Sequence, residues 1–381
     1  MTTTEERCNT DLGSFALHRY PRRKQETLRA WDAADELMLN HLARQQGEPI
    51  PPSPLILNDH FGALAVPLHG TRPISVSDSY ISQLSTRANL ESNGLDPTAV
   101  TLEHSLTPLP PAPPLVLIKI PKTLALLEHQ LRCLREVLQP QSRIVAGAML
   151  KTLQPSVFVL FERCIGPVTT SLAKKKARLL FAQFDPALEP GPSPFPSRYT
   201  LESPRLELVN HANLFSREKL DIGTRLLLAN LPTGDHYRDI MDLGCGNGVL
   251  GVCIAREHPD ARLYFRDESF MAVASAEHNF RTAYGETRPA HFDAGDCLTG
   301  VTDNSLDLIL NNPPFHQQNA VGDHIARRMF AQSLRALRPG GELWVIGNRH
   351  LSYHVQLKKL FGNCRVAASN PKFVVLVARK R

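Results

Sequence analysis

The sequence predicts an α/β protein that consists of two tandem domains with the same architecture. In the second half, from residue 238 onward, strand-like and helix-like segments alternate. This alternation is typical of a mostly parallel sheet covered by helices on both faces. The proline-rich segment 184–199 has the composition of a spacer between domains. The first half repeats the order of the second half in a less regular form.

Composition and charge are those of a soluble globular protein without a disulfide framework. The 381 residues are 42% hydrophobic and 21% charged, and the formal net charge is +6. A mild basic excess is compatible with nucleic-acid binding but does not require it. The seven cysteines are scattered without a Cys-x-x-Cys pair, which argues against a zinc site, and we expect no metal. No apolar run approaches the roughly 18 residues of a membrane span, and residues 1–13 show no secretion signal, so we expect a cytoplasmic protein.

Each element of the second half follows from its hydrophobic pattern and its bounding residues. Short apolar runs are expected to be buried strands, and longer amphipathic runs are expected to be helices. The last segment has two apolar runs about a turn, which predicts a terminal hairpin with an antiparallel last strand. The expected order is strand 238–246 with its glycine turn, helix 249–258, strand 261–268, helix 270–284, a strand before residue 296, strand 305–312, helix 324–341, strand 342–348, helix 353–362 and hairpin 364–380.

The first half contains weaker copies of motifs from the second half. The segment "LILNDHFGAL" (55–64) stands where "MDLGCGNGVL" (241–250) stands later, and "LVLIKIPK" (115–122) corresponds to "LILNNPPF" (308–315). Only Gly62 remains of the glycine cluster, and a lysine replaces an asparagine. We therefore expect a degenerate first domain. The alternative is that any two α/β domains are similar at this level of detail.

A glycine-rich turn lies between the first strand and the first helix of the second half. In "DLGCGNGVLG" the glycines at 244, 246 and 248 allow left-handed backbone angles and a close approach of a ligand, and the helix start offers free N–H groups. Open α/β sheets bind ligands at this edge. The spacing Gly246-x-Gly248-x-x-Gly251 also fits the dinucleotide fingerprint, so a nicotinamide-dependent enzyme is an alternative.

Two acidic residues follow the next two strands. Asp267 lies about 20 residues after the glycines, where a carboxylate is well placed to accept hydrogen bonds from both hydroxyls of a ribose. Asp296 follows the next strand and is placed to meet an adenine amino group. The alternative for each is an N-cap of the segment that begins after it, at Ser269 or Leu298.

The motif Asn312-Pro313-Pro314-Phe315 separates these alternatives. Two prolines end the strand and fix the backbone so that its carbonyl groups face the cleft. The Asn312 side-chain oxygen and the Pro313 carbonyl are suited to accept the two N–H groups of an exocyclic amine, which aims its lone pair at an activated methyl group. Phe315 is suited to stack on the base. The alternative is a strand-ending turn, which Asn-Pro often makes.

With these motifs the chain resembles class I S-adenosylmethionine-dependent methyltransferases of the Asn-Pro-Pro-aromatic group. It resembles more closely the bacterial ribosomal RNA guanine-N2 methyltransferases that have two tandem methyltransferase domains. The resemblance rests on "FSREKLDIGTRLLL" (215–228), "NPPFHQQ" (312–318) and "NRHLSYHVQLKKLFGN" (348–363), and the layout favours the 23S type over the related 16S type. It implies two Rossmann-like domains, each with a seven-stranded, mostly parallel sheet whose last strand is antiparallel. The first of these domains is expected to be degenerate.

The resemblance also implies an activity and a set of site residues. We expect S-adenosyl-L-methionine as cofactor and methylation of the N2 amine of one guanine in 23S rRNA. Asn312, Pro313 and Phe315 are the expected catalytic residues. In segment 215–228, Asp221 and Thr224 are expected to touch the cofactor, with a helix cap formed by Asp221 as an equal alternative. The expected cofactor-binding residues are Asp242, Gly244, Gly246, Gly248, Asp267, Asp296 and Asp221.

The domain boundaries and partners follow from the same resemblance. We expect a degenerate methyltransferase-like domain at 1–185 with an RNA-binding or structural role, a proline-rich linker at 186–200 and the catalytic domain at 201–381. The partner is rRNA that is poor in protein or free of it, and the sequence indicates no oligomer. The basic segments 19–24 and 172–180 and the terminal "RKR" are candidate phosphate contacts. Alternative acceptors are 16S rRNA, adenine N6 or a protein glutamine, and a further alternative is a non-catalytic RNA-binding protein.

Overall fold

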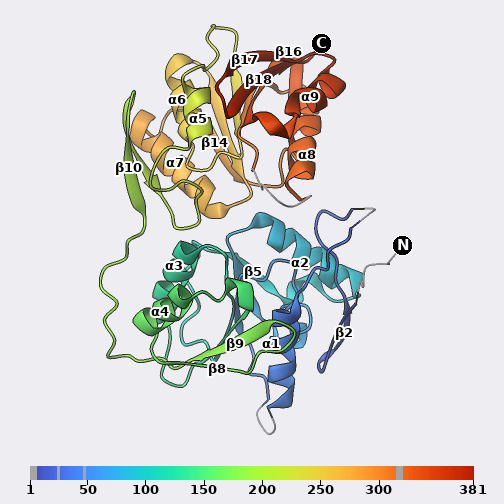
Figure 1. The fold of residues 1–381 in the computed structure, drawn as a ribbon, viewed down its shortest axis with the longest axis vertical. Helices are drawn as coiled ribbons and strands as arrows, with labels where there is room; N and C mark the ends of the chain where they lie inside the picture. The colour runs from blue at the N-terminus through green and yellow to red at the C-terminus, as the bar shows by residue number, and fades with distance from the viewer. Residues whose placement is uncertain (1–6, 24–25, 46–48, 315–320) are drawn as a thin grey trace. The chain divides into compact units, whose positions relative to one another are not determined.

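The computed structural model describes residues 7–23, 26–45, 49–314 and 321–381, without the side chains of 321–323. It divides into two compact units, Met1–Pro194 and Phe195–Arg381. In Figure 1 the first unit runs from blue to green, and the second runs from yellow-green to red. Each unit is built around its own sheet, so each is described separately.

The second unit contains a seven-stranded sheet in the order β14-β13-β12-β15-β16-β18-β17. β18 is antiparallel to both of its neighbours, and the other pairs are parallel. This confirms the predicted sheet with its antiparallel last strand. The strands are β12 (Asp239–Leu243), β13 (Arg262–Asp267), β14 (Ala290–Ala294), β15 (Leu306–Asn311), β16 (Leu337–Asn348), β17 (Arg365–Ser369) and β18 (Phe373–Arg379).

Helices cover both faces of this sheet because its strands are apolar on both sides. Leu308 and Leu310 of β15 pack in a cluster with α5, α6 and α7, whereas Ile309 between them packs in a cluster with α8 and α9. The helices are α5 (Ile222–Leu228), α6 (Val249–Glu257), α7 (Phe270–Tyr284), α8 (Val321–Ala336) and α9 (Tyr353–Phe361), with a short 3-10 helix η4 (Arg349–Leu351).

One predicted boundary in this unit was wrong. Pro-Gly-Gly was predicted to end the helix of segment 324–341, but the helix ends at Ala336 and β16 begins at Leu337, so Pro-Gly-Gly lies inside the strand. Leu337 pairs with Leu306, and the register between β15 and β16 then shifts. Gly340 has a φ of +86°, which lets the strand absorb this irregularity. Tertiary pairing therefore extends the strand back to residues that a local pattern assigns to the helix.

A hairpin precedes the second sheet and was not predicted. It consists of β10 (Ser197–Glu202) and β11 (Arg205–Asn210), so its first strand begins within the expected linker. Val209 of β11 exchanges two hydrogen bonds with the side chain of Asn279 on α7, at 2.8 and 3.0 Å. This pairing holds the hairpin against the second unit.

The first unit has a seven-stranded sheet in the order β5-β4-β3-β6-β7-β9-β8, with β9 antiparallel to its neighbours. This is the order of the second unit, so the predicted tandem architecture is confirmed. A separate hairpin is formed by β1 (Arg7–Thr10) and β2 (Gly13–Ala16). The sheet strands are β3 (Leu55–Leu57), β4 (Ile74–Ser77), β5 (Thr101–His104), β6 (Leu115–Lys119), β7 (Arg143–Met149), β8 (Val168–Thr170) and β9 (Ala177–Ala182).

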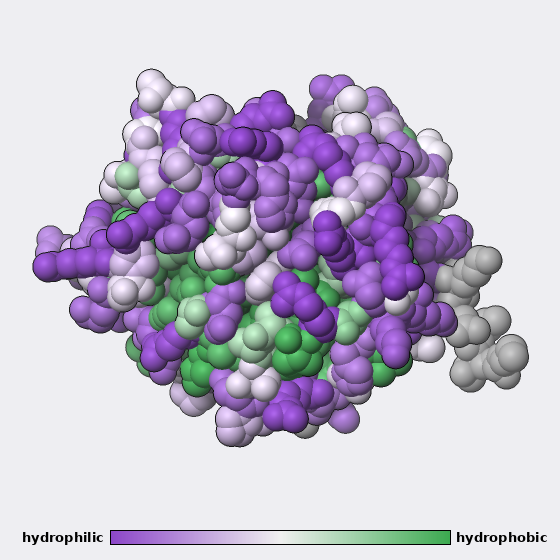
Figure 2. Space-filling view, turned by 90° about the horizontal axis from the view of Figure 1, so that it is seen from above, coloured by the Kyte–Doolittle hydropathy of each residue, from purple (hydrophilic) through white to green (hydrophobic). Residues whose placement is uncertain are grey.

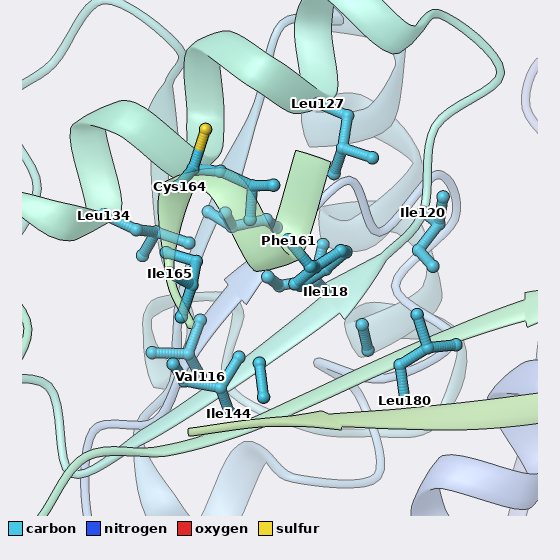
Figure 3. Packing of buried hydrophobic residues seen from close by; sticks show 14 of the residues in the cluster. Val116, Ile118, Ile120, Leu127, Leu134, Ile144, Phe161, Cys164, Ile165 and Leu180 are labelled. Carbon is cyan, nitrogen blue, oxygen red and sulfur yellow. The ribbon is translucent and has the colours of Figure 1, made fainter. Parts of the chain in front are cut away.

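Helices α3 and α4 pack on one face of the first sheet. Figure 3 shows Leu127 and Leu134 of α3 and Phe161 of α4 together with the strand residues Val116 and Ile144. Each fully buried side chain of this kind contributes about 1.5–3 kcal/mol to folding. The helices are α1 (Ala33–Arg44), α2 (Tyr80–Ser92), α3 (Leu124–Arg135) and α4 (Pro155–Cys164), with 3-10 helices η1 (His69–Thr71), η2 (Pro97–Ala99) and η3 (Leu150–Thr152).

The face in Figure 2 is covered mainly by hydrophilic residues, with a smaller area of hydrophobic ones. Within the described ranges, none of the helices combines the length and hydrophobicity that crossing a bilayer requires.

Candidate active site

The glycine loop connects β12 to α6. Gly244, Gly246 and Gly248 have φ values of +71°, +53° and +76°, in the left-handed region that favours glycine. The Gly244 nitrogen donates to the Arg266 carbonyl at 2.7 Å, which ties the loop to β13. The three glycines thus turn the chain from the sheet edge into the N-terminus of α6.

The space in front of these glycines differs from one to the next. A Cβ on Gly248 would lie 2.8 Å from the Cβ of Ala276, and a Cβ on Gly251 would lie 2.1 Å from Cε1 of Phe265. Both glycines therefore serve the close packing of α6. In contrast, a Cβ on Gly246 would meet no atom of the described chain within 4 Å. The loop consequently faces open space at Gly246, where a bound ligand would fit.

Asp267 lies at the end of β13 beside this open space. Its Oδ2 accepts a hydrogen bond from the Gly246 nitrogen at 3.0 Å, and its Oδ1 accepts one from the Ser269 nitrogen at 3.0 Å. Ser269 is the N-cap of α7 and accepts from the Ala272 nitrogen, so the alternative that Asp267 caps this helix was wrong. Burial raises the pKa of Asp267. Backbone nitrogens of three residues act on this carboxylate, which has about four lone-pair sites, so it can still accept a hydroxyl of a ligand.

Asp242 on β12 is 1% exposed and lies beneath the loop. Its Oδ2 accepts a 2.8 Å hydrogen bond from the Gly251 nitrogen, whereas its buried Oδ1 has no partner among the described residues. Burial raises the pKa of Asp242 to about 8, and the nearby charge of Asp267 adds to the shift. A buried oxygen without a partner is costly, so this atom fits a donor that a ligand supplies.

Asp296 follows β14 and forms an ion pair with Arg328 of α8. Arg328 also donates to Thr299 at 3.1 Å. The expected alternative for Asp296 was an N-cap, and it was wrong because no helix begins between β14 and β15, where every residue is described. The ion pair fixes α8 near the sheet edge, and the proposed contact of Asp296 with adenine stays a prediction.

Asn312 directly follows β15 and faces the glycine loop. A Cβ on Gly244 would lie 3.9 Å from the Asn312 carbonyl oxygen. The Asn312 Nδ2 donates to Thr224 Oγ1 at 2.9 Å, whereas its Oδ1 is buried and has no partner in the described chain. Pro313 is buried. Phe315, which we expected to stack on the base, lies outside the described residues.

Asp221 is the N-cap of α5. Its Oδ2 accepts hydrogen bonds from the Thr224 nitrogen at 2.9 Å and from the Thr224 hydroxyl at 3.3 Å. The helix-cap interpretation of Asp221 is therefore confirmed, and its contact with a cofactor stays a prediction. Thr224 connects this cap to Asn312, which places the start of α5 next to the end of β15.

A polar network that was not predicted from the sequence holds the glycine loop from the side of the hairpin. The Nδ2 of Asn247, inside the loop, donates to the Tyr199 hydroxyl at 3.1 Å and to Asn210 Oδ1 at 2.8 Å. Asn279 of α7 donates to the Asn247 carbonyl at 2.9 Å. Asn247 was visible as the polar residue of "GCGNG", but its partners lie 32 to 48 residues away and carry no local signal.

The first unit has the same backbone arrangement at this sheet edge as the second unit, but with different side chains. Leu57 pairs with Ile118 in the first sheet as Leu243 pairs with Asn311 in the second, which makes Asn58 the counterpart of Gly244. Asn58 has a φ of +65°, close to the +71° of that glycine. By the same register Gly62 corresponds to Gly248, Ser77 to Asp267 and Lys119 to Asn312. The first unit thus lacks the acid and the amide of the second.

Side chains of the first unit occupy its own sheet edge. Asp59 accepts hydrogen bonds from three successive backbone nitrogens, residues 63 to 65, at 2.8 to 2.9 Å. Lys119 donates to Asp32 Oδ1 and to Asp35 Oδ1, each at 2.6 Å. These groups satisfy one another, which agrees with a degenerate first domain.

The strand order, the glycine loop and the Asn-Pro-Pro end of β15 together define the second unit as a class I methyltransferase domain. Two family models match the chain: the RLMG N-terminal domain over residues 5–186 and the methyltransferase small domain over residues 205–377. The second model covers the strands and loops of the site described above.

Curated relatives extend this match over nearly the whole chain. A ribosomal RNA large subunit methyltransferase G from Aeromonas hydrophila is 50% identical over 96% of this chain and 97% of its own length. Proteins of the same name from Ectopseudomonas mendocina and Streptomyces coelicolor are 52% and 46% identical, each over 97% of this chain and 99% of the relative. The chain therefore belongs to the family of ribosomal RNA large subunit methyltransferase G.

A solved structure has the same two-domain fold. The 16S rRNA N2 methyltransferase RsmC of T. thermophilus, in complex with AdoMet and guanosine, aligns with a TM-score of 0.74 and 21% identity. The alignment covers 98% of this chain and 97% of that one. This likeness confirms the fold class.

S-adenosylmethionine is the methyl donor of a methyltransferase of this kind, and the site fits it. The open space at Gly246 admits a ligand against the loop. Asp267 offers carboxylate oxygens for ribose hydroxyls, and Asp242 offers a buried oxygen without a partner. The enzyme class and the cofactor that we expected from the sequence are thereby confirmed.

Proposed function

We propose that this protein transfers the methyl group of S-adenosylmethionine to the exocyclic N2 amine of one guanine in 23S rRNA. The observation that carries this proposal is the Asn312 amide, whose buried Oδ1 has no partner in the described chain. The backbone carbonyl of the same residue lies beside the glycine loop. Family membership supports the large-subunit RNA as substrate. The relative from T. thermophilus, whose name states N2 methylation of 16S rRNA, supports the acceptor atom.

The chemistry follows from hydrogen bonding. The N2 amine of guanine has two N–H groups and a lone pair that is delocalised into the ring. Asn312 Oδ1 and the Pro313 carbonyl oxygen would each accept one N–H, which frees the lone pair and aims it at the methyl group. Positioning and fixed dipoles supply most of the rate in such a site, so no strong general base is needed. The nitrogen loses one of its protons to solvent after the transfer.

The donor would be held by the glycine loop and the acids around it. When bound, S-adenosylmethionine supplies an activated methyl group on a sulfonium sulfur. Gly246 leaves room for the donor, Asp267 would accept from its ribose hydroxyls, and Asp296 would meet its adenine amine. Phe315 would stack on the guanine after the base leaves its helical stack.

We assign the boundaries 1–185, 186–200 and 201–381 to a degenerate domain, a linker and the catalytic domain. The degenerate domain would bind rRNA that is free of ribosomal proteins, in the cytoplasm. Basic residues 174–176 at the turn before β9 are exposed and suited to phosphate contacts, although Lys175 also pairs with Glu36 at 2.7 Å. A comparison of the methylation of naked 23S rRNA with that of assembled large subunits tests whether the substrate is free of ribosomal proteins.

The experiment that tests the activity uses labelled S-adenosylmethionine with three acceptors: unmodified 23S rRNA, unmodified 16S rRNA and a protein fraction. We expect label in N2-methylguanosine from 23S rRNA alone. N6-methyladenosine, methylglutamine or exclusive labelling of 16S rRNA would refute the proposal. Calorimetry with S-adenosylhomocysteine against NAD tests the donor, and exclusive binding of NAD would exclude methyl transfer.

A further inference from the structure

We infer that Thr224 is a positioning residue that fixes which way the Asn312 amide points. The inference rests on the proposed function, because it concerns how the oxygen of this amide is presented to the amine. An asparagine amide has an accepting oxygen at one end and a donating nitrogen at the other. Only the orientation with the oxygen toward the substrate accepts an N–H, so the site needs a device that selects it.

A chain of hydrogen bonds, in which each group can act only as donor or only as acceptor toward the next, selects this orientation. The Thr224 hydroxyl lies 3.3 Å from Asp221 Oδ2 and 2.9 Å from Asn312 Nδ2. A hydroxyl has one proton, and an ionised carboxylate only accepts, so the proton of Thr224 is directed to Asp221. The lone pairs that remain on Thr224 accept only from a donor. The neighbouring end of the Asn312 amide must therefore be NH₂, and its oxygen must face the other way.

The opposite orientation would fail on both sides. A flipped amide would place its oxygen against a hydroxyl oxygen whose proton is already engaged. It would also present NH₂ to an amine that needs an acceptor. Because Thr224 is only 5% exposed, water has little access with which to relieve this mismatch. Thr224 therefore favours one of the two orientations of the Asn312 side-chain amide, which have nearly the same shape.

The first unit supports this inference independently. Asp32 is the N-cap of α1 and Asp35 is its N3 residue, just as Asp221 and Thr224 are the N-cap and N3 residues of α5. In the first unit both positions contact Lys119, the counterpart of Asn312, at 2.6 Å. The fold thus directs the start of this helix at the end of the fourth strand in both units. In the second unit the hydrogen bonds of Thr224 with Asp221 and Asn312 stand where the first unit has the ion pairs of Lys119.

The start of α5 is also held firmly in place. A Cβ on Gly223 would lie 3.0 Å from Asp221 Oδ2 and 3.1 Å from Cε1 of Phe373 on β18. The helix N-terminus is therefore packed closely against the sheet. Such contact keeps the Thr224 hydroxyl at a fixed place, which is what a positioning residue requires.

Two substitutions of similar size separate the hydroxyl from the packing. Thr224→Val replaces the hydroxyl with a methyl group of nearly the same volume, whereas Thr224→Ser keeps the hydroxyl. We expect Thr224→Val to lower kcat for 23S rRNA about tenfold or more, because the buried NH₂ of Asn312 loses its acceptor. Thr224→Ser should retain turnover within about threefold. Affinity for S-adenosylhomocysteine should change little in both variants.

A double-mutant cycle tests whether Thr224 acts through Asn312. In an Asn312→Ala background, Thr224→Val should change turnover by no more than about twofold, because no amide remains to be oriented. An equal loss in both backgrounds, or wild-type kcat in Thr224→Val, would overturn the inference. The ratios of turnover between these variants do not depend on which methylated nucleoside the enzyme produces. If the wild-type enzyme yields no N2-methylguanosine, the proposed function fails, whereas an unchanged Thr224→Val with the expected product refutes the positioning role alone.

Discussion

The backbone nitrogen of Gly246 donates a 3.0 Å hydrogen bond to Oδ2 of Asp267. This contact joins the glycine loop after β12 to the end of β13 at the point where a Cβ on Gly246 would meet no described atom within 4 Å. One carboxylate therefore fixes the shape of the loop and borders the space in front of it. The predictions for donor binding follow from this arrangement.

Asp267→Asn should weaken binding of S-adenosylhomocysteine about tenfold or more. The amide loses the charge that strengthens hydrogen bonds to ribose hydroxyls, and such bonds are worth about 1.5–3 kcal/mol. Titration calorimetry measures the affinity. Asp293→Asn is a matched control, because Asp293 lies on the neighbouring β14 and its side chain is 62% exposed. Equal affinities in the wild type and Asp267→Asn would remove Asp267 from the binding site.

Gly246→Ala and Gly251→Ala should have different effects. At Gly246 the new methyl group enters the open space, so donor affinity should fall strongly, whereas the positive φ costs only about 1–2 kcal/mol of stability. At Gly251 the methyl group would collide with Phe265, and overpacking should lower the free energy of unfolding by about 1–3 kcal/mol. Calorimetry and denaturant unfolding on the same two proteins distinguish these outcomes. A Gly246→Ala variant with full donor affinity would contradict the assignment of the open space.

Asn312→Ala should lower kcat about 100-fold or more. The substitution removes an oxygen that holds the amine in the transition state, and loss of one such preorganised group typically costs 10²–10³ in rate. Affinity for S-adenosylhomocysteine should change little, because the amide is directed toward the acceptor amine. Single-turnover methylation of 23S rRNA measures the chemical step. Turnover at the wild-type level would show that Asn312 has no part in catalysis.

Asp242 should make the stability of the protein depend on pH. Burial raises its pKa to about 8 from an ordinary value of 3.8, so the folded state retains a proton that the unfolded state has lost. The free energy of unfolding should therefore fall as the pH rises from about 4 to about 8. Asp242→Asn keeps an acceptor for Gly251 but does not titrate. Its stability, measured in urea at pH 5 and pH 8, should decline less than that of the wild type, and parallel declines would contradict the raised pKa.

Lys119→Met should destabilise the protein by about 3 kcal/mol. The substitution leaves Asp32 and Asp35 without their shared cation, and breaking a buried ion pair is costly. Burial already raises the pKa of Asp35 to about 6, even beside this lysine. Lys122→Met is the control, since Lys122 lies three residues further on and is exposed. If both variants unfold at the same denaturant concentration, the ion pair contributes little to stability.

Much of the site was predictable from local patterns. The glycines of "DLGCGNG" fix a left-handed turn wherever a strand leads into a helix, and an acid at the end of the next strand must lie beside it in a parallel sheet. The pairing of Leu243 with both Arg266 and Asn311 brings these segments together as expected. The mostly parallel sheet, the antiparallel last strand and the duplicated architecture follow from the same pattern of elements, whereas the strand order was not predicted.

The tertiary structure decided what no local pattern records. The hairpin β10–β11 was missed because proline-rich composition masks its first strand. The ion pair of Asp296 depends on Arg328, which lies 32 residues later on α8. Asp221 shows most clearly which features the sequence determines and which the tertiary structure determines. The sequence determined that an acid stands before a helix, whereas only the fold set that helix against the end of β15. Asp221, Thr224 and Asn312 therefore share one chain of hydrogen bonds, in which Thr224 and Asn312 are 88 residues apart. Periodicity and turn chemistry act over a few residues and can be predicted from sequence, but the direction of a hydrogen bond between distant segments depends on how the whole core packs.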